Sequence, residues 1–72
     1  MFKVGTVLNL DDGKDYAVVT NINFQNKIYI YLIDINDNTN MMFCELENDE
    51  LVAVKDIELI KQLSLLYNLL KA

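Results

Sequence analysis

The sequence lacks most of the residues on which enzyme active sites depend. Its 72 residues include no histidine, no tryptophan, no proline, no arginine and only one cysteine. Histidine is the usual general base near neutral pH, and Cys44 has neither an imidazole to activate it nor a second cysteine to pair with. Nor is there a cluster of cysteine and histidine that would hold zinc. We therefore expect a protein that is not an enzyme and that uses no cofactor or metal.

Secretion and membrane signals are also missing. A single cysteine excludes an internal disulfide, which is typical of a protein from a reducing compartment. Met1 to Gly5 do not form a basic region followed by an apolar run, and no stretch of about 18 uninterrupted apolar residues occurs. These absences predict a cytoplasmic protein that does not span a membrane.

Positive charge is scarce. The chain has 11 acidic residues and 6 basic ones, all lysine, so its net charge is -5. The lysines are scattered along the chain rather than clustered, so no basic patch is available to contact a phosphate backbone. Direct binding to nucleic acid is therefore disfavoured. Heavy use of asparagine, isoleucine and lysine without arginine suggests an AT-rich genome, bacterial or viral.

The residues that are present predict one small α+β domain spanning 1–72. Apolar and polar residues alternate with a period of two from Thr6 to Val54, interrupted by clusters of turn-forming residues. This pattern predicts a curled five-stranded antiparallel β-meander, resembling a small open barrel. The strands are expected at about Thr6–Leu10, Asp15–Phe24, Lys27–Ile35, Met41–Glu47 and Leu51–Val54.

Turn residues fix an expected register for the second hairpin. A two-residue turn at Gln25-Asn26 would pair Ile22 with Tyr29 and Val18 with Ile33. One face of the sheet would then carry Tyr16, Val18, Ile22, Phe24, Tyr29, Tyr31, Ile33 and Ile35. The other face would carry Ala17, Val19, Asn21, Asn23, Ile28, Ile30, Leu32 and Asp34. The remaining turns are expected at Asp12-Gly13, over 36–39 and at Asn48-Asp49.

From Asp56 the apolar period becomes that of a helix, which we expect to run over about 56–70 with Asp56 as its N-cap. One apolar stripe, expected to face the sheet, contains Ile57, Ile60, Leu63, Tyr67 and Leu70. A second stripe contains Leu59, Leu66 and Leu69. A single sheet face does not obviously cover both stripes, so the second stripe is a candidate for self-association into a homodimer.

Several apolar residues are candidates for contact with a partner protein. Tyr29 and Tyr31 alternate on one strand, where they either pack in the core or form an aromatic binding patch. Met41, Met42 and Phe43 are adjacent on a strand, so at least one must point outward. Cys44 alternates with Met42 and is expected in the core. The candidate protein-binding residues are Tyr29, Tyr31, Met41, Phe43, Glu45, Glu47, Leu66 and Leu69.

Acidic residues surround two of the expected turns. We expect them to form one acidic flank composed of Asp34, Asp37, Glu45, Glu47, Asp49 and Glu50. They lack the regular spacing and central glycine of a calcium loop, so solvated charges are the favoured interpretation. Glu45 and Glu47 also have the form of an acid pair for glycoside chemistry, but no cleft for a sugar is evident from the sequence.

The segments 27–32 and 43–59, which include Glu45-Leu46-Glu47 and Glu50-Leu51-Val52, resemble a family of small acidic bacterial domains of unknown function. The resemblance covers about two thirds of the chain and implies a hairpin, an acidic turn and a closing helix. It implies no activity, and no functional residue is carried over from it.

These observations predict a non-enzymatic, acidic protein-binding module that acts as a small regulator or inhibitor of a partner with a basic surface. Phage-encoded inhibitors of host defence nucleases, including anti-CRISPR proteins, have this size and charge and provide an analogy. The alternative is a domain that binds a small ligand or nucleotide, with Tyr29 and Tyr31 stacking against its ring.

Overall fold

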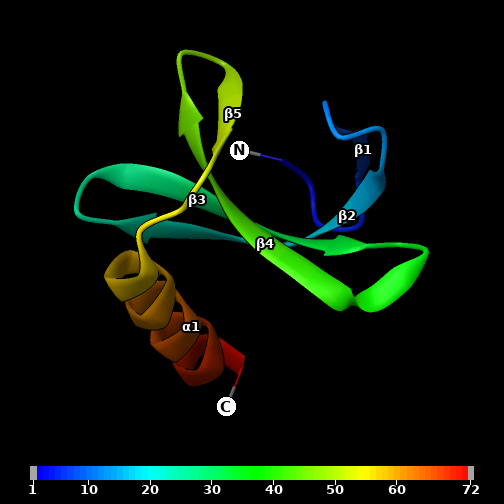
Figure 1. Ribbon diagram of the computed structural model, residues 1–72. Helices are drawn as coiled ribbons and strands as arrows, with labels where there is room; N and C mark the ends of the chain where they lie inside the picture. The colour runs from blue at the N-terminus through cyan, green and yellow to red at the C-terminus, as the bar shows by residue number, and fades with distance from the viewer. Residues whose placement is uncertain (1, 72) are drawn as a thin grey trace.

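The computed structural model describes residues 2–71, which form one curled antiparallel sheet and one C-terminal helix (Figure 1). The strands are β1 (Val7–Asn9), β2 (Asp15–Phe24), β3 (Lys27–Asp34), β4 (Asp37–Glu47) and β5 (Glu50–Ala53), and the helix is α1 (Ile57–Lys71). The strand order is β1-β2-β3-β4-β5, and each strand is antiparallel to the next. The predicted α+β meander with a C-terminal helix is therefore confirmed.

Short turns join the strands with the handedness that a twisted sheet requires. Gln25 and Asn26 have φ values of 52° and 63°, and Asn48 and Asp49 have values of 49° and 66°. Two successive left-handed residues are the mark of the hairpin turn whose twist matches that of its strands. Gly13 has a φ of 80° and closes the β1–β2 connection, as expected from the glycine at this position.

The third turn is shorter than expected. The structure places it at Ile35 and Asn36, and β4 begins at Asp37 rather than near Met41. The backbone N–H of Asn36 donates a hydrogen bond of 2.8 Å to Oδ1 of Asp34. An aspartate that accepts from the backbone two residues later can form a turn by itself. The polar residues that follow then belong to β4.

A β-bulge at Val19 changes the register expected for β2. Ile22 pairs with Tyr29 as expected, but Val18 pairs with Leu32 rather than with Ile33. Because β2 has one extra residue at the bulge, the side chains that precede it point to the opposite face from the one expected. Tyr16 and Val18 therefore lie on the opposite face of the sheet from Ile22, and the expected assignment of these two residues is wrong.

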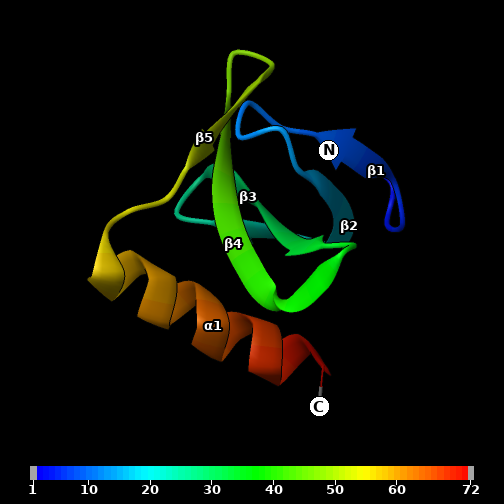
Figure 2. The same cartoon turned by 45° about the vertical axis from the view of Figure 1, so that its right-hand side comes forward.

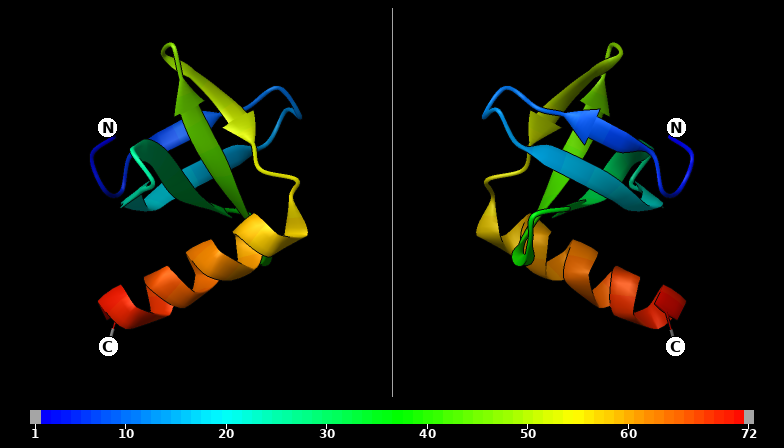
Figure 3. Two further views of the ribbon diagram at one scale, coloured as in Figure 1. Left: turned by 90° about the vertical axis from the view of Figure 1, so that its left-hand side faces the viewer. Right: turned by 90° about the vertical axis from the view of Figure 1, so that its right-hand side faces the viewer.

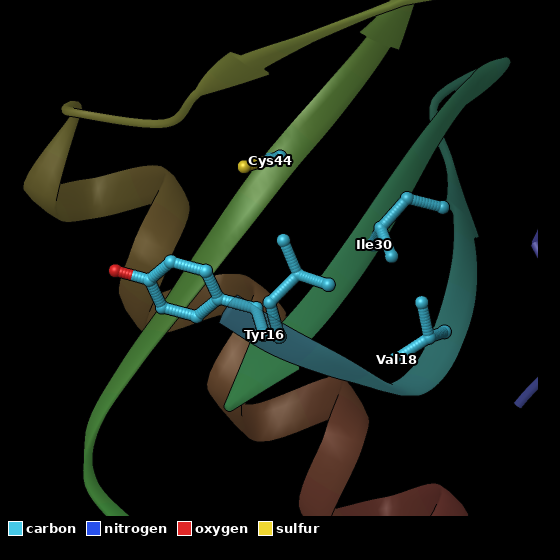
Figure 4. Packing of buried hydrophobic residues seen from close by; sticks show 5 residues of the cluster. Tyr16, Val18, Ile30 and Cys44 are labelled. Carbon is cyan, nitrogen blue, oxygen red and sulfur yellow. The ribbon is translucent and has the colours of Figure 1, made fainter. Parts of the chain in front are cut away.

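The bulge gives the sheet two buried faces. Inside the curl, five buried residues pack together, namely Tyr16, Val18, Ile30, Leu32 and Cys44 (Figure 4). On the outer side the buried residues are Ile22, Tyr29, Phe43 and Leu63, and the last of these comes from α1. Figures 2 and 3 show the helix lying across this outer side of the sheet. Ile30, Leu32 and Leu63 are fully buried, whereas Ile60, which was expected to face the sheet together with Leu63, is only partly buried.

The helix begins where its N-cap was expected. Oδ1 of Asp56 accepts hydrogen bonds from the N–H groups of Glu58 at 3.0 Å and Leu59 at 3.5 Å, which supplies acceptors for N–H groups that the first turn leaves free. Among residues 2–71, no helix has the length and apolarity needed to cross a bilayer.

The helical face that meets the sheet differs from the one expected. Leu63 is its fully buried centre, and the half-buried residues that pack around it are Leu59, Ile60, Leu66 and Tyr67. Ile57 is exposed because it lies about a third of a turn away from Leu63 around the helix axis. Leu70 is exposed because the last turn lies away from the strands (Figure 3). These two residues are therefore not part of the sheet-facing stripe.

Replacing Leu63 with alanine tests the packing of the helix on the sheet. Because this side chain is fully buried, Leu63→Ala should lower the free energy of unfolding by about 2 to 5 kcal/mol through lost burial and the cavity left behind. Leu69→Ala is the matched control, since Leu69 is 72% exposed on the same helix; it should change stability by less than about 0.5 kcal/mol. Equal shifts of the urea midpoint in both variants would show that α1 does not pack as described.

Candidate binding groove

The predicted aromatic patch lies in the core under α1. Tyr29 and Phe43 are buried in the cluster that includes Leu63. The Tyr31 ring stacks on Phe43 and is tilted against Tyr67, with ring centroids 4.7 Å apart in both pairs. These contacts assign the aromatic side chains to the junction of helix and sheet, so Tyr29 and Phe43 offer no surface to a partner in this conformation.

The other predicted apolar contact residues are separated by the same packing. Leu66 is half-buried against the sheet, whereas Leu69 is exposed. Met41 is 50% exposed, and its Sδ accepts a hydrogen bond of 2.7 Å from the Tyr31 hydroxyl. Leu69 and Met41 are thus the exposed residues of this candidate set. Self-association remains a prediction.

The acidic residues do not form the single flank that was expected. Asp34 is only 5% exposed and accepts hydrogen bonds inside the molecule. Oε1 of Glu45 lies 3.7 Å from Nζ of Lys27, and the Glu45 side chain is only 18% exposed. Asp37 begins β4, whereas Glu47 ends it, so they lie at opposite ends of a long strand. The expectation fails because burial and pairing remove two of the six carboxylates from the surface.

A different acidic site forms where the curled sheet remains open. A groove of about 610 Å³ lies between the β1 side of the sheet and β5. Its lining residues are Phe2, Asn9, Leu10, Asp11, Asp12, Met42, Cys44, Asp49, Glu50, Leu51 and Ala53. The β1–β2 connection and β5 lie near each other in Figures 2 and 3. The groove is thus the unclosed side of the half-barrel.

The groove combines an apolar floor with an acidic rim. Met42, Cys44 and Leu51 belong to, or pack against, the inner core cluster. Asp11 and Asp12 come from the connection after β1, while Asp49 and Glu50 come from the β4–β5 hairpin, and all four are exposed. No lysine is among the lining residues within 2–71. The site therefore presents four negative charges around an apolar surface.

Hydrogen bonds stabilise the ionised form of one rim carboxylate. Oδ2 of Asp12 accepts a bond of 2.7 Å from the Tyr16 hydroxyl, and Oδ1 accepts one of 2.9 Å from the backbone N–H of Lys14. These donors stabilise the charged form, so they lower the pKa of Asp12 below its ordinary value. The same interaction raises the pKa of Tyr16.

The network continues into the core from Tyr16. Nδ2 of Asn40 donates to the Tyr16 hydroxyl at 3.3 Å and to Oδ2 of Asp34 at 3.2 Å. Asp34 is the buried carboxyl group whose oxygens this arrangement satisfies. The rim of the groove is therefore tied to β2, β3 and β4 through hydrogen bonds between side chains.

The floor of the groove has little capacity for chemistry. Burial raises the pKa of the Cys44 thiol, so the nucleophilic thiolate is a minor form at neutral pH. Sγ of Cys44 lies 3.6 Å from Sδ of Met42 and has no imidazole near it, because the chain contains no histidine. Within the described residues, no group of three or more histidine, cysteine, aspartate or glutamate side chains is placed to hold a metal ion. The arrangement suits binding by apolar contact and charge.

Sequence reasoning missed most of this groove. Asp11 and Asp12 are visible only as turn residues in the sequence, and Leu51 and Ala53 only as a short strand. The one available signal was the alternation that directs Met42 and Cys44 toward the core. What joins these segments is the curl of the sheet, which no local pattern reveals.

Comparison of the chain with models of protein families, with curated proteins and with solved structures found no match. The resemblance to small acidic bacterial domains therefore stays a prediction. Any functional conclusion depends on the groove itself.

Replacing Tyr16 with phenylalanine tests the network under the rim. Tyr16→Phe should destabilise the protein at neutral pH because Asp12 loses its hydroxyl donor. Since the folded pKa of Asp12 is lowered, this stabilisation is present above the unfolded value of about 3.9 and is lost as pH falls through the folded value. Since the folded pKa of Tyr16 is raised from 10.0, it is also lost as pH rises through that folded value.

The stability difference between wild type and Tyr16→Phe should therefore stay constant across the neutral range and shrink in acid. Urea unfolding at a series of pH values measures it. Tyr67→Phe is the control, because its ring packs in the helix–sheet cluster and takes no part in the network. A difference that grows as pH falls below about 4 would contradict this account of Asp12.

Proposed function

We propose that this protein is a non-enzymatic protein-binding module, a small regulator or inhibitor that binds a basic segment of a partner protein in the groove between β1 and β5. The observation that carries the proposal is the lining of the groove, in which, among residues 2–71, four carboxylates and no lysine surround an apolar floor. An apolar cleft with a few polar groups at its margin is the usual form of a binding site.

Charge favours a basic partner over any other. The net charge of -5 attracts cationic proteins over a distance of roughly 8 to 10 Å at physiological ionic strength. Carboxylates around a concave apolar surface focus that attraction on the groove. Apolar side chains of the partner would then displace water from the Met42 and Leu51 side chains, which supplies affinity that charge alone does not.

This chemistry fits a partner whose own function uses a basic surface, such as the nucleic-acid channel of a nuclease. Occupying that surface with an acidic domain would exclude the nucleic acid, which is how an inhibitor of a host defence nuclease, including an anti-CRISPR protein, would act. The proposal places the protein in the cytoplasm, and the unpaired, buried Cys44 supports a reducing compartment.

A nucleotide-binding function has less support. The aromatic residues suggested for stacking a ring pack against α1 instead, with Tyr31 between Phe43 and Tyr67. Of the described residues that line the groove, Phe2 alone is aromatic, and the rim of carboxylates would repel a phosphate. We therefore favour a protein partner.

Selection from a library of random displayed peptides tests the proposed function. The selected peptides should be enriched in lysine and arginine together with apolar residues. Their association rate should fall steeply as salt is raised, while their dissociation rate changes little, because charge mainly steers the encounter. Enrichment of acidic or uncharged peptides would contradict the proposal.

Two double variants with equal changes of charge locate the binding site. Asp49→Asn with Glu50→Gln removes two charges from the rim and should weaken the selected peptides by about tenfold. Asp37→Asn with Glu58→Gln removes two charges outside the groove lining and should change affinity by less than about twofold. Equal losses in both variants would show that the groove is not the binding site.

A further inference from the structure

The groove is bounded by two strand edges whose backbone groups point into the opening. At the two ends of β1, the carbonyl of Thr6 accepts from the N–H of Val18, and the N–H of Leu10 donates to the carbonyl of Lys14. Backbone groups of alternate residues point to opposite sides of a strand. Thr6, Leu8 and Leu10 therefore face β2, and the N–H and C=O groups of Val7 and Asn9 face away from it.

β5 also has one edge that faces away from its neighbouring strand. The N–H of Val54 donates to the carbonyl of Phe43 on β4. By alternation, Val52 and Glu50 also face β4, which agrees with their pairing to Glu45 and Glu47. The N–H and C=O groups of Leu51 and Ala53 then point away from β4. Because these two residues line the groove, their free backbone groups lie at its edge.

The two edges cannot close the half-barrel as an antiparallel pair. Each strand is antiparallel to the next, so β1 and β5 have the same sense in the alternation of the sheet. One additional strand placed between them would be antiparallel to both. A sheet of six strands closed in this way would be antiparallel throughout and would have no free edge.

We propose that the partner binds as an extended basic segment that adds a strand between β5 and β1 and completes the barrel. This inference rests on the proposed function and specifies its binding mode. Every second side chain of the added strand, which is one phase of its alternation, would lie over Met42 and Cys44, so these side chains should be apolar. Side chains of the other phase would point outward to the carboxylates of Asp11, Asp12, Asp49 and Glu50, so they should be lysine or arginine.

The shortness of the edges sets the length of the segment. β1 has 3 residues and β5 has 4, so a segment of about five or six residues is enough to pair with both. Alternation of apolar and basic residues is therefore required only over this length. Main-chain hydrogen bonds would supply affinity, and the two phases of side chains would supply selectivity.

An eight-residue peptide of alternating valine and lysine with blocked ends is the probe. Two methylated forms carry N-methyl groups on the valine amides or on the lysine amides, which removes the donors of one phase while keeping every side chain and charge. In an inserted strand, the amides of one phase pair with β5 and those of the other pair with β1. Both methylated peptides should therefore bind at least about tenfold more weakly than the parent peptide.

The outcomes separate the binding mode from the proposed function. Failure of the parent peptide to bind, or equal binding to wild type and to the Asp49→Asn, Glu50→Gln variant, would overturn both. If binding of the parent peptide depends on these two charges and both methylated forms bind as tightly as the parent, the proposed function stands and strand addition is overturned. Loss of affinity in only one methylated form would overturn insertion between the two edges.

Discussion

The structure depends on burying both faces of β3. Ile30 and Leu32 are fully buried inside the curl, and Tyr29 is buried on the outer side beneath α1. Each fully buried side chain of this kind contributes roughly 1.5 to 3 kcal/mol, which is a large share of the stability of a 72-residue domain. One face is covered by the helix. The other can be covered only if the sheet curls over itself.

The curl explains why a groove exists. The bulge at Val19 bends β2 and directs Tyr16 and Val18 inward, where they cover Ile30 and Leu32. Five strands bend far enough to bury this inner face, but within residues 2–71 β1 and β5 do not pair, so the half-buried Met42 and Leu51 at the margin of the inner core stay accessible along one side. Binding at that opening would therefore use apolar surface that the fold leaves uncovered.

The acidic rim has two physical explanations that involve the same residues. Charged side chains at sheet edges prevent uncontrolled pairing between copies of a protein, and four carboxylates of like sign do this well. The same charges admit a basic strand, because its lysines remove the repulsion that keeps acidic chains apart. Protection of the edges from pairing with other copies is thus compatible with selective binding. The carboxylates that repel other acidic chains attract a partner that carries the opposite charge.

Local sequence patterns predicted the elements but not how their faces meet. Periodicity located β2 with its ends, and turn chemistry located Gly13 and the Gln25-Asn26 turn. The bulge escaped prediction because the segment Val18 to Thr20 is β-branched throughout and alternates plausibly in either register. The sheet-facing side of α1 was misassigned because leucines surround much of the helix, so periodicity alone could not select the stripe centred on Leu63.

The candidate site was harder to predict for the same reason. Glu45 appears in the sequence as a surface carboxylate, but its pairing with Lys27 follows from the register between β3 and β4. Asp11 and Glu50 lie 39 positions apart and line one groove only because the sheet is curled. Long-range contacts of this kind depend on tertiary packing, which period and turn signals do not encode.

The central claim is that the half-barrel of the free protein is open, with β1 and β5 as unpaired edges. Native-state amide hydrogen exchange, followed residue by residue by NMR, tests it most directly. We expect slow exchange at Leu8 and Val52, whose N–H groups face the neighbouring strand, and fast exchange at Val7, Asn9, Leu51 and Ala53, whose N–H groups face away from it. Slow exchange at these last four amides in the free monomer would show that the edges are already paired and would contradict the account.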